Sequence, residues 1–227
     1  MPTLDFSNPI LAIDCGTSIM SLAVACGNQM YEFCENIGVQ QSNRLLPEIE
    51  KLLQQANIQV KDLAYIVYNQ GPGMFTGLRI DIGVAQGLAV AFNTKLIGVP
   101  SLDATAYLVA DNPCVLAAID ARMNEVFYAF FDTKNQQQLT PYKTGKIEEI
   151  KLPDNVDNVV GIGNAFGIYK NICNISGNLK MPVATDFITC AKSGRYTTTD
   201  ATYASLLYVR DKVALTVSEQ ALQKGLK

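Results

Sequence analysis

The sequence predicts an α/β protein that contains two copies of one subdomain. Two apolar strand-like runs, Ile10–Asp14 and Val115–Asp120, both end in Ala-Ile-Asp, and they lie about half of the 227-residue chain apart. Two further strand-like segments follow each run, and helical patterns lie between the copies. Such self-similarity indicates an internal duplication, and the mixture of strand and helix patterns indicates an α/β fold. A chance likeness between two short strands is the alternative.

Five strands and three helices are predicted in the first half. Short apolar or alternating runs predict strands over residues 10–14, 21–26, 30–35, 63–69 and 95–99. Apolar residues at helical spacing predict helices over residues 44–56, 76–92 and 101–110. A residue that can cap a helix stands at each start: Asn43, Thr76 and Ser101. With this first cap, Pro47 falls in the first turn, where proline is tolerated.

The second half repeats the strand pattern of the first. Strands are predicted over residues 115–120, 125–132, 138–143 and 159–163. A helix is predicted over residues 186–192 and ends before Gly194, whereas residues 203–213 fit a helix and an extended segment alike. We expect an N-terminal subdomain over residues 1–110 and a C-terminal subdomain over residues 111–227.

The composition excludes several classes of chemistry. The sequence contains no histidine, so Ser–His–Asp and Cys–His nucleophile pairs, imidazole acid–base catalysis and His-ligated zinc are all excluded. The net charge is −3 and no cluster of Lys and Arg is visible. Because phosphate neutralisation requires such clusters, the chain by itself is not expected to bind nucleic acid.

We expect a cytoplasmic protein without membrane association. No segment reaches about 18 consecutive apolar residues, and the longest candidate, residues 82–92, is interrupted by Gln86 and two glycines. The N-terminus lacks the basic region of a signal peptide. The six cysteines form no C-x-x-C pair, which favours buried, reduced thiols.

Two turns that follow the repeated strands are candidates for a vestigial nucleotide site. The first turn reads Asp14-Cys-Gly-Thr17-Ser18, and its backbone N–H groups and hydroxyls could face a phosphate while Asp14 holds Mg²⁺ through water. Asp120 is the corresponding residue of the second copy. An ordinary β-turn is the alternative. In Asp120-Ala-Arg-Met-Asn-Glu125, an acid–base role is possible in principle, but a turn held by an Asp–Arg pair is favoured.

The sharpest local feature is the glycine-rich loop of residues 71–79. It lacks the Gly-Lys-Ser/Thr of a P-loop and the third glycine of the dinucleotide fingerprint. The loop leads into a helix N-terminus, where an anion could bind, but a role in setting the helix direction is favoured. Its candidate residues are Gly71, Gly73, Phe75, Thr76 and Gly77. A second glycine-rich stretch, residues 161–167, could likewise approach a nucleotide, and a chain turn is again favoured.

The predicted helix over residues 76–92 is apolar on nearly every side. One sheet can cover only one of these sides, so the other requires a neighbouring helix or a second chain. A row of small residues would allow another backbone to approach closely. The helix over residues 44–56 could share this surface, and burial within the chain is the alternative. The candidate interface residues are Leu45, Leu46, Ile49, Leu53, Arg79, Ile82, Gly83, Gln86, Gly87 and Val90.

The duplicated strand–meander–helix layout resembles the actin-like ATPase superfamily, whose fold is ribonuclease H-like. Six stretches further resemble the bacterial TsaB family, also called YeaZ, of tRNA threonylcarbamoyladenosine biosynthesis. They follow the family's order over nearly the whole chain: residues 10–14, 44–47, 70–79, 98–102, 120–125 and 208–211. Cys15 stands where the family often has Thr, Met74 where Ser is frequent, and Gln40-Gln41 where some members have His. These departures weaken the case for a nucleotide at the Asp14 turn.

The resemblance implies an actin-like fold with a degenerate active site. It implies a non-catalytic scaffold that activates a TsaD-type catalytic paralogue and works with a TsaE-type ATPase. Together they transfer threonylcarbamoyl to the adenosine beside the anticodon of tRNA. The two apolar helices would form the interface with the paralogue, and the isolated protein would form a homodimer. No cofactor is expected on this chain alone; ATP and Mg²⁺ would belong to the full complex, through which alone tRNA is reached.

Two positions distinguish this chain from the catalytic paralogue. TsaD-like proteins carry an H-x-x-x-H metal pair after a Gly-Val strand end, and the comparable positions here hold Ser101 and Thr105. Neither side chain can replace an imidazole as an iron or zinc ligand. The alternative function is a small actin-like ATP-dependent kinase or ATPase, which would use Asp14, Thr17 and Asp120. A protease-like role finds no supporting residues.

Overall fold

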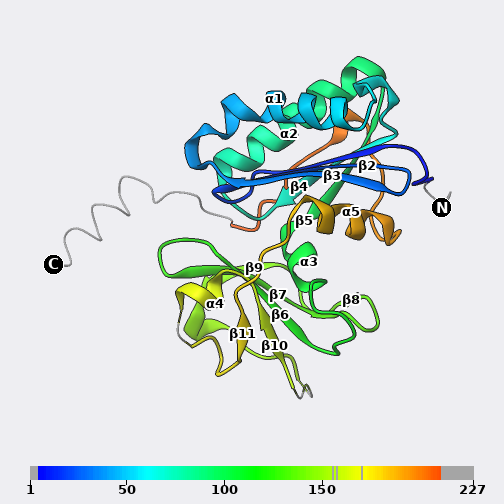
Figure 1. The fold of residues 1–227 in the computed structure, drawn as a ribbon. Helices are drawn as coiled ribbons and strands as arrows, with labels where there is room; N and C mark the ends of the chain where they lie inside the picture. Colours follow the sequence, from blue (N-terminus) through cyan, green and yellow to red (C-terminus); the bar gives the residue numbers. More distant parts are fainter. Residues whose placement is uncertain (1–4, 155, 157, 170, 211–227) are drawn as a thin grey trace.

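Two β-sheets form the framework of the protein. The computed structural model describes residues 5–210, apart from residues 155, 157 and 170. In Figure 1 the N-terminal sheet lies above the second sheet, and the helices α1 (Gln41–Gln55) and α2 (Phe75–Phe92) cover its outer face. The helix α3 (Ser101–Ala106) lies where the two halves meet.

The first sheet has the strand order β3-β2-β1-β4-β5. Its strands are β1 (Ile10–Asp14), β2 (Ile19–Cys26), β3 (Gln29–Asn36), β4 (Tyr65–Gly71) and β5 (Lys95–Pro100). The strands β1, β2 and β3 form an antiparallel meander, whereas β4 and β5 run parallel to β1. All five strands predicted from the first half of the sequence are therefore confirmed, with their ends moved by one or two residues.

The second sheet repeats this order. Its strands are β6 (Val115–Asp120), β7 (Glu125–Asp132), β8 (Gln137–Gln138), β9 (Lys143–Lys146), β10 (Val160–Ile162) and β11 (Gly177–Asn178). The path β11-β10-β6-β7-β8 places β6 between an antiparallel partner and a parallel one, as β1 is placed in the first sheet. The actin-like, ribonuclease H-like fold class with two duplicated subdomains is thereby confirmed.

One predicted strand is wrong. Residues 138–143 do not form a single strand; β8 and β9 are two short strands, and both pair with β7. Thr140 lies between them and its hydroxyl accepts the backbone N–H of Phe130 at 3.0 Å, which replaces a strand bond there. The sequence also missed β11 and the one-turn helix α4 (Ala165–Ile168), which are too short for a periodic pattern to reveal.

All three helices of the first half begin earlier than their predicted caps require. The helix α1 begins at Gln41, so Asn43 is its third residue and Pro47 lies inside it. Its early start is fixed by Gln41, whose Nε2 donates to Thr17 O at 2.7 Å. Thr76 is the second residue of α2 and Ser101 the first of α3, and neither side chain caps its helix.

The two faces of the first sheet bury different cores. Alternate residues of β1 point to opposite faces, as strand geometry requires. Leu11 and Ile13 pack under α1 and α2, whereas Ile10 and Ala12 pack against α5 (Ala184–Lys192). This placement corrects the assignment of α5, which the sequence put in the second subdomain. The division near residue 110 stays a proposal for the sheets, with α5 belonging to the first by its packing.

The helix α3 joins the two halves. Leu102 and Ala106 lie in the core of the second sheet, and Ala104 lies in the core of the first. Between them, the Asp103 carboxylate accepts hydrogen bonds from Tyr142 at 2.6 Å and Tyr196 at 2.9 Å. Because Tyr142 comes from the second half and Tyr196 follows α5, this one carboxylate ties both halves to α3.

The last described residues are extended. A single 3₁₀ turn covers Ala201–Tyr203, and residues 204–210 have no regular secondary structure. Leu207 N donates to Gln70 O at 2.8 Å. This agrees with the extended alternative for residues 204–210; Tyr203 ends the 3₁₀ turn, and residues 211–213 of that prediction lie outside the described residues.

One helix of the described chain, α2, is long and apolar enough to cross a membrane by length and composition alone. The sequence did not predict such a segment, because its longest apolar candidate, residues 82–92, is too short to cross a membrane. A helix that covers a sheet on one side and meets a protein partner on the other satisfies the same criterion. Asp81 and Gln86 of α2 are hydrogen-bonded to other parts of the chain, which ties the helix to the first subdomain.

Candidate functional site

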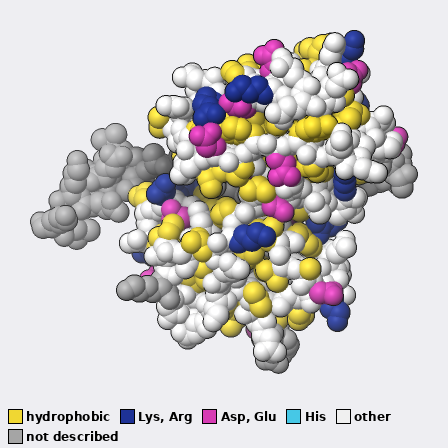
Figure 2. Space-filling model, viewed as in Figure 1, with side chains coloured by type: hydrophobic (Ala, Val, Ile, Leu, Met, Phe, Trp, Pro, Cys, Tyr) yellow, Lys and Arg dark blue, Asp and Glu magenta, His cyan; other side chains and the backbone are white. Residues whose placement is uncertain are grey.

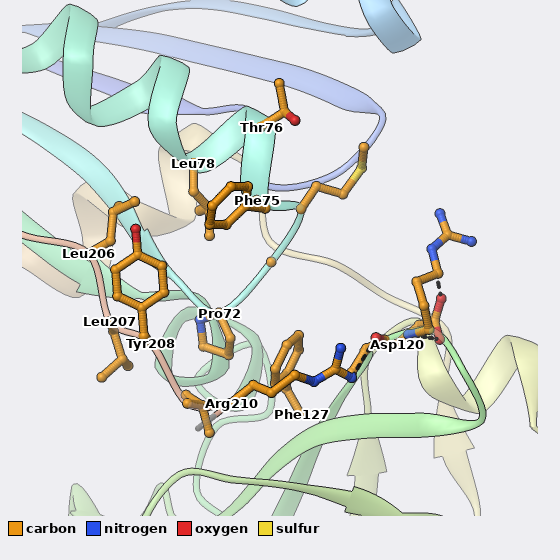
Figure 3. Close-up of a pocket in the computed structure, with 15 residues that line it drawn as sticks. Pro72, Phe75, Thr76, Leu78, Asp120, Phe127, Leu206, Leu207, Tyr208 and Arg210 are labelled. Atoms are coloured by element: carbon orange, nitrogen blue, oxygen red, sulfur yellow. Dashed lines mark hydrogen bonds and ion pairs between the residues drawn. The ribbon is translucent and has the colours of Figure 1, made fainter. Parts of the chain in front are cut away.

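The candidate site lies between the two subdomains. A cavity of about 350 Å³ opens beside the N-terminus of α2, the turn after β6 and the last extended segment. Figure 3 shows Phe75 and Leu78 on the first side of this cavity, Asp120 and Phe127 on the second, and Tyr208 and Arg210 on the extended segment. The site is therefore built from both copies of the duplicated unit, at the ends of their strands.

The Asp14 turn is closed by its own surroundings. Asp14 is buried, and its Oδ1 accepts hydrogen bonds from Asn69 Nδ2 at 2.8 Å and Gly16 N at 2.9 Å. Burial raises the pKa of Asp14 to about 6. Met74 N donates to Gly16 O at 2.8 Å, so the start of α2 lies directly on this turn.

A second buried carboxylate lies beneath the same turn. Asp81 of α2 is fully buried, and its Oδ2 accepts the backbone N–H of Cys15 at 2.8 Å. Its Oδ1 has no hydrogen-bond partner among the described residues. Burial, together with the nearby Asp14 carboxylate, raises the pKa of Asp81 well above its usual value. Two adjacent buried carboxylates disfavour ionisation of both.

The glycine-rich loop allows α2 to approach this turn. A Cβ on Gly77 would overlap the carbonyl oxygen of Cys15, and a Cβ on Gly73 would lie 2.8 Å from Gly16 O. Gly71 has a positive φ of 98°, which glycine adopts without strain. Phe75 and Thr76 are the first two residues of α2 and are exposed. The loop thus sets the position of the helix, the role that its sequence favoured.

The N–H groups at the start of the Asp14 turn are not available to a phosphate group. The N–H groups of Cys15 and Gly16 are donated to protein carboxylates, and that of Met74 is donated to a carbonyl. Thr17 Oγ1 accepts from Ile19 N at 3.1 Å, while Thr17 O accepts from Gln41. A phosphate needs such N–H groups free, and two buried carboxylates would repel it. No step of chemistry is therefore assigned to a nucleotide here.

Asp120 is likewise engaged by protein groups. Its Oδ1 accepts from Arg122 N and Tyr169 OH, both at 3.0 Å, and its Oδ2 lies 3.6 Å from Arg122 Nε. Asn164 Oδ1 accepts the N–H of Asp120 at 2.8 Å. This agrees with the favoured interpretation of a turn held by an Asp–Arg pair. The residues Arg122, Met123 and Asn124 all have positive φ values, which this network supports.

The second glycine-rich stretch serves chain packing. A Cβ on Gly161 would overlap the ring of Phe166, and one on Gly163 would overlap Ala118 O. Gly163 N donates to Asn178 O at 3.0 Å, which holds β11 beside β10. These glycines lie within the second subdomain, as expected for a chain turn rather than for a ligand contact.

The cavity is lined mainly by apolar side chains, with Arg122 and Arg210 among its lining residues. Pro72, Phe127 and Leu206 line its interior, and exposed Phe75 and Tyr208 lie at its mouth with ring centroids 6.4 Å apart. Figure 2 shows hydrophobic side chains gathered in the middle of this face, where the two halves meet.

The exposed sides of α1 and α2 carry five of the ten residues that the sequence predicted for a partner interface, which stays a prediction. Gly83 and Gly87 are exposed, and a Cβ on either would meet no atom within 4 Å. Val90 is 71% exposed and Leu46 of α1 is 54% exposed. Arg79 lies over the Phe75 ring at 3.8 Å from its centroid. We call these five residues, Leu46, Arg79, Gly83, Gly87 and Val90, the partner face.

Several of the predicted interface residues belong to the core instead. Leu45, Ile49 and Leu53 are at most 5% exposed and lie on the side of α1 that packs against the first sheet. Their inclusion among the interface residues was wrong, because the most apolar side of α1 packs on the first sheet. The outer side of α1 is mainly polar. Ile82 and Gln86 are half-buried, and the Gln86 amide bonds to the chain rather than facing outward.

The sequence analysis missed two groups of site residues. Asp81 and Asn69 close the Asp14 turn, and the signal for Asp81 was a lone carboxylate in an otherwise apolar helix. Phe127 and Tyr208 line the cavity from segments 81 residues apart, and no local pattern joins them. The two positions compared with the metal pair of TsaD-like proteins are buried: Ser101 Oγ donates to Pro72 O, and Thr105 Oγ1 donates to Ser101 O at 2.7 Å.

The chain is similar to proteins of one biosynthetic pathway. The family model described as "TsaD: tRNA N6-adenosine threonylcarbamoyltransferase" matches residues 37–193. A protein from Buchnera aphidicola subsp. Schizaphis graminum, described as "tRNA threonylcarbamoyladenosine biosynthesis protein TsaB", is 32% identical over 154 residues, which are 66% of this chain and 73% of that protein. The Escherichia coli K12 protein with the same description is 29% identical over 224 residues, which are 90% and 96% of the two chains.

Solved structures show the same likeness. The structure described as YeaZ from Pseudomonas aeruginosa has a TM-score of 0.78 and 28% identity, and the match covers 88% of this chain and 99% of that one. A second P. aeruginosa structure, described as similar to peptidase YeaZ, has a TM-score of 0.80 and 28% identity, with 89% and 100% covered.

Proposed function

Because the chain belongs to the TsaB (YeaZ) family of tRNA threonylcarbamoyladenosine biosynthesis proteins, we propose that it is the non-catalytic scaffold subunit of the threonylcarbamoyl-transferring complex. In this role it binds and activates a TsaD-type catalytic paralogue in the cytoplasm. A TsaE-type ATPase completes the complex, and tRNA is reached through it. The isolated chain forms a homodimer through the surface that the paralogue otherwise occupies.

The partner face is the observation that carries this proposal. It places two exposed glycines one helical turn apart beside exposed Val90, on a helix whose opposite side is buried against the sheet. Glycines at the centre of an apolar helix face let the backbone of a second helix approach closely, and this favours packing of one helix on another at the interface. Arg79 on the same helix and exposed Leu46 on α1 would supply a cation and a further apolar contact.

Scaffolding is supported over catalysis by the state of the candidate catalytic groups. Asp14 and Asp120 are engaged by protein donors, and the hydroxyls of Ser101 and Thr105 are donated to backbone carbonyls. A catalytic group needs to reach its substrate within hydrogen-bond distance. We therefore propose that this chain acts through binding and has no enzymatic activity of its own.

Gly87→Arg is expected to weaken binding of the catalytic paralogue by at least about 100-fold, because an unpaired charge buried in an interface costs about 3–5 kcal/mol. The same variant is expected to sediment as a monomer when isolated. Thr189→Arg is the matched control: it adds the same charge at an exposed position of α5, on the opposite face of the sheet. Sedimentation velocity with the purified paralogue measures both. An intact Gly87→Arg complex would remove the partner face from the interface.

The second candidate function, a small actin-like kinase or ATPase, is favoured only by the fold. Titration of the isolated chain with Mg-ATP in a calorimeter is expected to give no binding heat at millimolar nucleotide, because the N–H groups of Cys15 and Gly16 in the Asp14 turn are already donated to buried carboxylates. Saturable heat that is lost in Asp14→Ala would favour the kinase hypothesis instead.

A further inference from the structure

The extended segment of residues 199–210 runs along the first subdomain as a strap. Thr199 pairs with Leu96 of β5 through two backbone hydrogen bonds of 2.8 and 2.9 Å. Further on, Ser205 O accepts from Tyr68 OH at 3.0 Å and from Gln70 Nε2 at 3.2 Å. Figure 1 shows this segment, in orange, leaving the first sheet toward the gap between the halves.

Gln86 attaches the strap to α2. Its Nε2 donates to Ala201 O at 2.7 Å and to Ala204 O at 3.3 Å. Gln86 is half-buried and lies between Gly83 and Gly87 of the partner face in the sequence, one residue from Gly87. The same short helical stretch thus carries the partner face on its outer side and the strap on a half-buried flank beside it.

Arg210 attaches the far end of the strap to the second subdomain. Its Nη2 donates to Ala121 O at 3.0 Å and pairs with the Glu125 carboxylate, and its guanidinium lies 5.9 Å from the Phe127 ring centroid. Figure 3 shows Arg210 reaching across the cavity toward Phe127 and the Asp120 turn. Residues 206–210 also form one wall of the cavity, so the strap both spans and encloses it.

We propose that residues 199–210 couple the partner face of α2 to the cavity between the subdomains, with Gln86 and Arg210 as the two anchoring residues. A partner that fixes α2 would hold Ala201 and Ala204 in place, and the strap would hold Arg210 against the second subdomain. Hydrogen-bond chains between rigid elements can carry such coupling. This inference rests on the proposed function only for the identity of the partner, the TsaD-type paralogue.

The absence of tryptophan makes a single reporter possible. Phe127→Trp, with 5-fluorotryptophan incorporated in this chain alone, places one ¹⁹F nucleus in the cavity wall. The H₂O/D₂O shift of its resonance measures exposure to solvent. In the Phe127→Trp protein, which is the parent of all the variants below, this shift is expected to be less than half of that of free 5-fluorotryptophan. It is expected to rise at least two-fold when Arg210→Met or Gln86→Leu is added. Arg44→Met and Gln54→Leu, both on α1 and away from the cavity, are the matched controls and are expected to leave it unchanged.

Addition of the purified paralogue is expected to lower the H₂O/D₂O shift further in the Phe127→Trp protein, but not in the same protein with Gln86→Leu. Sedimentation velocity on the same samples reports whether the complex forms. If no complex forms with the parent, the proposed function fails, while the strap is still judged by the shifts of the isolated variants. If the complex forms and the resonance does not respond, or if Gln86→Leu matches its control, the coupling is overturned. Circular dichroism checks that each variant is folded.

Discussion

Gly77→Ala is expected to lower the free energy of unfolding by about 3 kcal/mol or more. A Cβ at this position would overlap the carbonyl oxygen of Cys15, and a clash with a backbone atom cannot be relieved by turning a side chain. Overpacking of a tight site typically costs about 1–3 kcal/mol, and a backbone clash lies at the upper end. Urea unfolding followed by circular dichroism measures the change.

Gly83→Ala on the same helix provides the matched control when both substitutions are made in the Gly87→Arg protein, which is expected to be a monomer and so leaves the outer side of α2 uncovered. A Cβ there meets open space, so alanine is expected to raise the free energy of unfolding by about 0.5–1 kcal/mol through its better helix propensity. Opposite signs for the two substitutions would show that α2 is held against the Asp14 turn at its N-terminus and is free on its outer side. Equal effects would contradict the close packing at Gly77.

Asp81→Asn is expected to stabilise the protein at pH 8 and to have little effect at pH 4. Desolvation and the neighbouring Asp14 carboxylate both disfavour the charged form of Asp81, and the neutral amide avoids this cost. The amide keeps an oxygen for the N–H of Cys15 and carries no charge. Urea unfolding at both pH values measures the difference.

The sign of this pH dependence follows from the raised pKa values. The folded state binds protons more tightly than the unfolded state at Asp81 and Asp14, so the unfolding free energy falls as pH rises from about 4 through the folded pKa values. For Asp14, with its pKa of about 6, this loss is complete by about pH 7. Asp154→Asn, at an exposed position, is the control and is expected to be neutral at both pH values. Destabilisation by Asp81→Asn at pH 8 would show that its charge is compensated.

Gly77→Ala and Asp81→Asn both test how tightly the turn after β1 is packed against α2. The turn after β1 is packed against α2 and sealed by carboxylates, where an actin-like ATPase would need free N–H groups for phosphate. Gly77 allows that packing and Asp81 completes it. If both predictions hold, the degenerate site is a stable structural element rather than an open pocket, in agreement with a scaffold function.

Local pattern was sufficient for the five strands of the first sheet and for β6, but not for the helix starts. The strands β1 and β6 each combine an apolar run with a terminal Asp, so their period and their repetition were visible in the sequence. The start of α1 was misplaced because Gln41, which fixes it, bonds to Thr17 across the fold. Likewise, α3 has its first turn held by Ser101 against Pro72 rather than by a cap. Long-range contacts of this kind leave no periodic signal.

The partner face, too, could be predicted only in part from local sequence pattern. The sequence identified α1 and α2 as too apolar for one sheet, and two of its glycines and Val90 are indeed exposed. It could not distinguish which apolar residues of α1 face the sheet, because Leu45 and Leu46 are equally apolar. Burial places the first in the core and leaves the second outside. The rotation of α1 about its own axis, relative to the sheet, determines which of the two leucines is buried.

The sequence by itself determined the duplicated α/β fold, the absence of imidazole chemistry and the family, because these depend on residue types and on patterns repeated along the chain. The tertiary structure alone decided that the Asp14 turn is sealed and that α5 returns to the first sheet. It also decided that the strap joins α2 to the second subdomain. Each of these depends on residues far apart in the chain, such as Cys15 with Asp81 and Arg210 with Glu125, whose contact arises only when the whole chain is packed.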